Sequence, residues 1–80
     1  MKTILAIDLG KRKSVFCKLD TSSLKPEYFT LRTDPQQFHD TFASLDQHNS
    51  IVLFEVGTQA GWLADMLRDN KPWQYKTRAA

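Results

Sequence analysis

The sequence predicts a single α/β domain built on a mixed β-sheet, and three observations support this prediction. Two short runs, Thr3–Gly10 and Ile51–Glu55, are apolar on both faces, as central strands covered on both sides are. Between them lie two strand patterns and one helical pattern. The chain has 80 residues, with apolar and charged fractions of 41% and 25%. Ordinary fractions at this length suit one small folded domain, so we assign residues 1–80 to one unit.

The first three strands follow one another through short turns, which predicts antiparallel pairing. The first turn begins at Gly10, which can take a positive φ without strain. The second strand, residues 14–20, alternates: Val15, Cys17 and Leu19 face one way, and Ser14, Phe16 and Lys18 face the other. The third, residues 27–32, follows Pro26 and is polar on one face, which is typical of an edge strand.

The first helix has a clear start. Asp34 is the expected N-cap, Pro35 takes the first helical position, and Gln37 has capping-box spacing. We expect this helix to continue to Asn49. Its apolar stripe is Phe38, Phe42 and Leu45.

A parallel strand and a second helix follow. Because a long helix precedes residues 51–55, this strand is predicted to run parallel to an earlier one, through a right-handed crossover. Thr58 is the expected N-cap of the second helix, and Asn70 and Pro72 end it. Gly61 would allow this helix to approach the sheet closely. The helix buries Ala60, Leu63, Met66 and Leu67, with Trp62 beside them.

The predicted order is three antiparallel strands, a helix, a parallel strand, a helix, and a fifth strand that begins at Trp73. This is the opening half of an RNase H-like fold, in which the first and fourth strands are neighbours. Asp8 and Glu55 would then meet at adjacent strand ends. Two carboxylates there suit Mg²⁺, which prefers oxygen ligands. The alternative is structural: Asp8 caps the turn at Gly10, and Glu55 pairs with a lysine such as Lys11.

A run of three cations, Lys11, Arg12 and Lys13, occupies the first turn. These residues could keep an exposed turn soluble, or they could contact nucleic-acid phosphates. Net charge is +2 overall but uneven: residues 1–33 carry +4, residues 34–69 carry −5, and the rest +3. A basic face beside an acidic region is compatible with a polyanion on one side. His39 and His48 are too far apart on the first helix to form a ligand pair.

Composition limits the setting of the protein. One cysteine, Cys17, excludes an internal disulfide and fits a reducing compartment. No apolar run approaches the ~20 residues that span a membrane, and the N-terminus has no secretory pattern. We therefore expect a cytoplasmic protein that does not bind membranes.

Several motifs resemble the amino-terminal part of the IS110-family transposases, which have a RuvC-like DEDD domain. They are Ala6-Ile7-Asp8-Leu9-Gly10-Lys11 followed by Ser14-Val15, and later Phe54-Glu55-Val56-Gly57 before Trp62-Leu63. The resemblance covers roughly residues 3–70. It implies that Asp8 and Glu55 are the first two of four catalytic, metal-binding acids. It also implies Mg²⁺ or Mn²⁺ as cofactor, DNA as substrate, and a structured RNA as guide.

The chain departs from that family in one large respect. The two later aspartates and the serine-bearing carboxy-terminal domain are absent, and Asp65 and Asp69 lie on the second helix instead of a strand end. We therefore expect a fragment that binds metal weakly and has no transposase activity alone. The other readings are an actin- or Hsp70-like ATPase fragment and a non-catalytic interaction module.

Truncation would also leave apolar surface uncovered. We expect Phe16, Trp73 or Tyr75 to be exposed and to favour a homo-oligomer.

Overall fold

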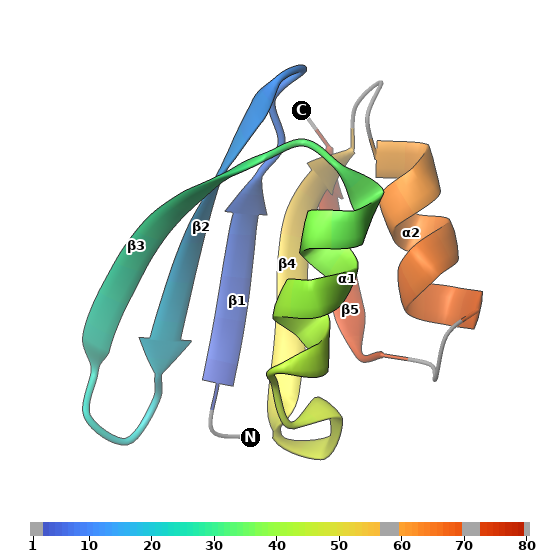
Figure 1. Cartoon of the computed structure of the whole chain (residues 1–80). Helices are drawn as coiled ribbons and strands as arrows, with labels where there is room; N and C mark the ends of the chain where they lie inside the picture. Colours follow the sequence, from blue (N-terminus) through green and yellow to red (C-terminus); the bar gives the residue numbers. More distant parts are fainter. Residues whose placement is uncertain (1–2, 57–59, 70–72, 80) are drawn as a thin grey trace.

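The computed structural model describes residues 3–56, 60–69 and 73–79. Within these residues, five strands and two α-helices follow one another in the predicted order, with one short 3₁₀ turn, η1 (Figure 1). The expected caps and stops at Thr58, Asn70 and Pro72 lie outside the described residues. The elements are β1 (Thr3–Asp8), β2 (Lys13–Asp20), β3 (Lys25–Arg32), α1 (Pro35–Ala43), η1 (Gln47–Asn49), β4 (Ser50–Val56), α2 (Ala60–Asp69) and β5 (Tyr75–Ala79).

The five strands form one mixed sheet in the order β3-β2-β1-β4-β5. β1 pairs antiparallel with β2, and β2 with β3, whereas β4 runs parallel to β1 and β5 runs parallel to β4. This is the α/β topology of RNase H-like folds, and the prediction of fold class is confirmed. β3 lies at the edge of the sheet, as its polar face and Pro26 predicted.

Both helices cover the same face of the sheet, and the core lies between them and the strands. Alternate residues of each central strand point into it, as the strand period of two requires. In the described residues no element covers the other face (Figure 1). The expectation that β1 is covered on both sides was therefore wrong for one of its two faces. The buried apolar residues are Leu5, Ile7, Phe16, Phe38, Phe42, Val52, Phe54, Leu63 and Leu67.

Aromatic contacts join the antiparallel half of the sheet to the helices. Phe16 stacks on Phe29 at a ring separation of 4.9 Å and meets the edge of Phe38 at the same distance. Phe38 in turn contacts Trp62 of α2 at 5.0 Å. Phe16 is therefore fully buried beneath α1, and the expectation that it is exposed was wrong. Trp73 and Tyr75 are partly buried.

The first helix is shorter than predicted. Asp34 does cap it, accepting from the backbone N–H of Gln36 at 3.2 Å, one residue earlier than the capping-box spacing. The helix ends at Ala43 because both the backbone N–H and the hydroxyl of Ser44 donate to the carbonyl of Thr41.

Asp46 then caps η1 separately. Its carboxylate accepts from the side chain of Asn49 and the N–H of His48, and these hydrogen bonds lower the pKa of Asp46. That contribution to stability is present above the ordinary pKa of an aspartate and is lost as the pH falls through the lowered value. A second capped start therefore replaces the continuous helix expected to Asn49.

The glycines play different roles from those predicted. Gly10 does not adopt a positive φ. A Cβ on Gly10 would instead collide with the carbonyl oxygen of Lys13, so glycine is needed for close backbone approach across the turn. Gly61 is exposed, and a Cβ there would meet nothing within 4 Å. The expected close approach of Gly61 to the sheet was therefore wrong.

No helix in the described part of the chain is long and apolar enough to cross a membrane.

Replacing Gly61 by alanine should raise the free energy of unfolding by about 0.5–1 kcal/mol, because it reduces the entropy of the unfolded chain without a clash. Urea denaturation of the two proteins measures the difference. Gly10→Ala is the opposite control and should destabilise the protein. A loss of stability in Gly61→Ala would contradict the placement of that residue.

Candidate functional site

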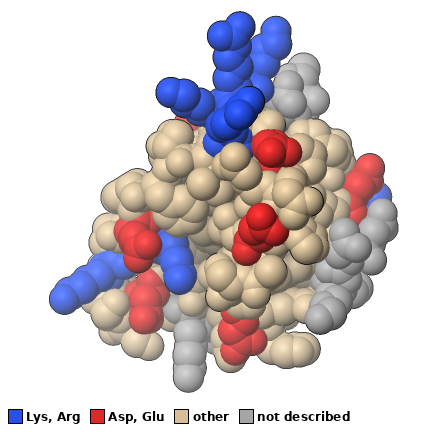
Figure 2. Space-filling model, in the orientation of Figure 1, with Lys and Arg blue, Asp and Glu red and all other residues tan. Residues whose placement is uncertain are grey.

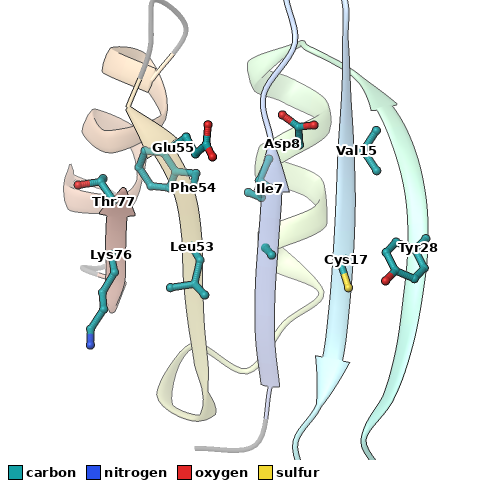
Figure 3. Close-up of a pocket in the computed structure, with 11 residues that line it drawn as sticks. Ile7, Asp8, Val15, Cys17, Tyr28, Leu53, Phe54, Glu55, Lys76 and Thr77 are labelled. Carbon is teal, nitrogen blue, oxygen red and sulfur yellow. The ribbon is translucent and has the colours of Figure 1, made fainter. Parts of the chain in front are cut away.

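Asp8 and Glu55 lie at the carboxyl ends of two neighbouring parallel strands: Asp8 is the last residue of β1, and Glu55 is the last but one of β4. β1 and β4 pair in the register Ile7↔Phe54, so Asp8 and Glu55 are the next positions on each strand. Side chains at equivalent positions of paired strands share one face of the sheet. Both residues line the same groove, and Figure 3 shows their carboxyl groups at the same end of the two strands. The predicted juxtaposition of these two strands is present.

Both carboxylates lie on the face that the helices leave open, and both residues are exposed to solvent. Among the described residues no hydrogen bond or ion pair holds the Asp8 carboxylate, so it does not cap the turn at Gly10 in the way the structural alternative required. Glu55 stands opposite Arg78 in the pairing of β4 with β5. The two acids therefore present oxygen atoms where water can also reach.

This pair fits a hydrated divalent cation of the Mg²⁺ type, which takes one or two carboxylates and keeps several waters. It is not a complete metal site. In the ranges 3–56, 60–69 and 73–79, no group of three or more histidine, cysteine, aspartate or glutamate residues could hold a metal ion. His39 lies beside Asp40 at 3.7 Å, on α1, away from the two acids.

The groove beside the acids has a volume of about 660 Å³ and a mostly apolar floor. Among the described large apolar residues, the exposed ones are Val15, Leu24 and Tyr28, and two of these line the groove. Cys17 faces Tyr28 across β2 and β3, and its hydrogen bond raises the pKa of the Tyr28 phenol. The other side chains shown in Figure 3 are Ala6, Ile7, Leu53, Phe54, Lys76 and Thr77.

The basic turn between β1 and β2 lies at the same end of the sheet as the two acids. Lys11, Arg12 and Lys13 are all exposed. Figure 2 shows Lys and Arg side chains gathered at the end of the molecule where this turn lies in Figure 1. The sequence thus located the cations correctly, while their role as nucleic-acid contacts stays a prediction.

A short hydrogen-bond chain holds the backbone of this turn. The Thr33 hydroxyl donates to the carbonyl of Gly10 at 2.7 Å, and the Thr33 N–H donates to the carbonyl of Arg12 at 2.8 Å. The Ser14 and Thr33 hydroxyls are also 2.7 Å apart. Because Thr33 has one hydroxyl proton, which it gives to Gly10, Ser14 must be the donor in that pair. Ser14 is fully buried, so its hydroxyl has no access to a ligand.

Sequence reasoning missed Arg32. It is the Cα partner of Lys13 across β2 and β3, and it is exposed. A fourth cation therefore stands at the basic end of the sheet. Counting the antiparallel register outward from the second turn would have found it, but the length of that turn was not evident from the sequence.

Comparison with protein-family models and with curated proteins found no match for this chain. The resemblance to transposases therefore depends on the motifs and the topology alone.

Replacing Thr33 by valine should lower the free energy of unfolding by about 1–3 kcal/mol, because it leaves the buried Ser14 hydroxyl without its acceptor. Chemical denaturation measures this change. Thr30→Val is the matched control: Thr30 is exposed on the same strand as Arg32, and its replacement should change stability by less than about 0.5 kcal/mol. Equal effects of the two variants would contradict the proposed hydrogen-bond chain.

Proposed function

We propose that this chain supplies the first two carboxylates of a divalent-metal site for phosphodiester chemistry, as the amino-terminal part of a DNA transposase or recombinase of the RuvC-like type. The observation that carries the proposal is the alignment of Asp8 with Glu55 at the ends of two adjacent parallel strands, on the open face of the sheet. The resemblance of the surrounding motifs to IS110-family transposases supports the same assignment. DNA is the partner that this function requires, and the resemblance to IS110-family transposases implies a structured RNA as guide.

Asp8 and Glu55 would hold Mg²⁺ or Mn²⁺ through their carboxylate oxygens. When bound, such an ion polarises a phosphoryl oxygen and helps to generate a nucleophile at neutral pH. The chain itself contributes the rigid placement of the two acids, since each comes directly after a buried residue of its strand: Ile7 and Phe54 are each 4% exposed. Solvent exposure of both acids leaves room for water ligands, and two carboxylates alone give weak binding.

The geometry argues against the ATPase alternative. A phosphate-binding turn of that kind offers small hydroxyl side chains after its glycine. Here the first hydroxyl after Gly10 belongs to Ser14, which is buried and bonded to Thr33. The residues between them are the long cations Lys11, Arg12 and Lys13. An ATP titration distinguishes the two functions, and the transposase proposal expects no saturable nucleotide site.

Titration with Mn²⁺ tests the carboxylate pair directly. Paramagnetic broadening of amide NMR signals should be strongest near Ile7 and Phe54, and Asp8→Asn should remove most of it. Asp20→Asn is the matched control, because Asp20 is an exposed acid at the opposite end of the sheet, where it accepts from the Ser22 N–H. Broadening that persists in Asp8→Asn, or disappears equally in Asp20→Asn, would refute the site.

The chain alone should show no nicking or recombination of plasmid DNA with Mg²⁺, because two carboxylates do not complete the site. An assay on supercoiled plasmid, with Asp8→Asn as the background control, measures this. Turnover that depends on Asp8 would show that the two acids suffice.

The homo-oligomer expected from the sequence stays a prediction, and light scattering checks it.

A further inference from the structure

We propose that Lys13 and Arg32 form a phosphate-binding pair for a nucleic-acid backbone, next to Asp8 and Glu55 on the open face of the sheet. The proposal rests on the proposed function, because the phosphate belongs to the same phosphodiester polymer. The proposal adds Arg32 to the site. It also distinguishes Lys13 from Lys11 and Arg12, because the strand register assigns Lys13 to the face that carries the acids.

The register places the two cations on the face that carries the acids. Asp8 pairs with Val15 across β1 and β2, and both line the groove. Lys13 is two residues before Val15 and therefore shares its face. Arg32 pairs with Lys13 and so lies on that face too. From β3 to β4 the four strands thus present two cations and then two anions at one end of the sheet.

The two cations are available to a ligand. Both are exposed, and among the described residues neither forms an ion pair, with Asp8 or with any other acid. Adjacent strands lie about 4.8 Å apart, so the long side chains of Lys13 and Arg32 can reach one phosphate group. The guanidinium of Arg32 offers paired donors that match two phosphate oxygens, and Lys13 adds a point charge.

The backbone that carries this pair is already ordered. Thr33 follows Arg32 directly. Its N–H and its hydroxyl donate to the carbonyls of Arg12 and Gly10, which lie in the turn between β1 and β2. The ends of β2 and β3 are thereby tied together without a ligand. Binding then requires no ordering of this backbone, which lowers its entropic cost and favours affinity.

A nucleic acid fits this end of the sheet better than an acidic peptide does. Lys11 and Arg12 extend the positive charge beyond the pair, as a repeating chain of phosphates requires. We therefore commit to a nucleic-acid backbone as the occupant.

Fluorescence anisotropy with 20-nucleotide single-stranded DNA, duplex DNA and RNA tests the proposal. The measurement is made in EDTA between 50 and 200 mM KCl, so it does not depend on the metal site. Arg32→Ala and Lys13→Ala should each weaken binding of the tightest probe about five- to tenfold at 50 mM KCl. Each should also reduce the slope of log K against log salt by about 0.7–0.9, the value of one phosphate contact.

Lys25→Ala is the matched control. Lys25 is an exposed cation on the same strand as Arg32, at its opposite end, and its replacement should change affinity less than twofold. Circular dichroism verifies that all three variants are folded, which their exposed positions favour.

Three outcomes would overturn the proposal: no binding of any of the three probes, equal losses in Arg32→Ala and Lys25→Ala, or equally tight binding of polyglutamate. Loss of Mn²⁺ binding at Asp8 has no bearing on these measurements. A selective effect of Arg32 would therefore stand even if the metal site failed, and the two failures are distinguishable.

Discussion

The parallel pairing of β1 with β4 is the interaction on which the rest of this structure depends. It places Ile7 beside Phe54 in the core, under the helices, and the following residues, Asp8 and Glu55, at the solvent-facing end. Because side chains alternate along a strand, a slip of β4 by one residue against β1 would turn Glu55 toward the core and leave Asp8 alone on the open face. The buried Ile7 and Phe54 therefore also determine the position of the acids.

The second organising feature is the connection between the basic turn and the end of β3. Thr33 joins them through its N–H and its hydroxyl, and the absence of a Cβ on Gly10 lets the backbone pass close to Lys13. The cations are thereby carried on a fixed backbone instead of a loose loop. Acids and cations occupy the same end and the same face of one sheet, an arrangement suited to a polyanion that brings its own metal ions.

One face of the sheet is not covered by either helix. Parallel strands are usually buried on both sides, yet here both helices lie on one side, and the groove on the other side has an apolar floor beside the charged end. The sequence led to the expectation that Phe16 would be part of such a surface. Phe16 is instead the centre of the aromatic contacts with Phe29 and Phe38, and Val15 and Tyr28 are the exposed residues. The alternation of β2 was read correctly; what the sequence did not show was which of its faces the helices would cover.

The sequence by itself determined the order and type of the main elements and the edge position of β3, because these depend on local periodicity and on a few rules of strand connection. The neighbouring positions of Asp8 and Glu55 followed from the RNase H-like topology that this order indicated. Tertiary structure decided what depends on contacts distant in sequence. Hydrogen bonds of Ser44 and Asp46 ended α1 before Asn49, where propensity alone would have continued it. The register of β2 with β3 brought Arg32 beside Lys13, although 18 residues separate them, since the length of the intervening turn sets that register and no local pattern encodes it.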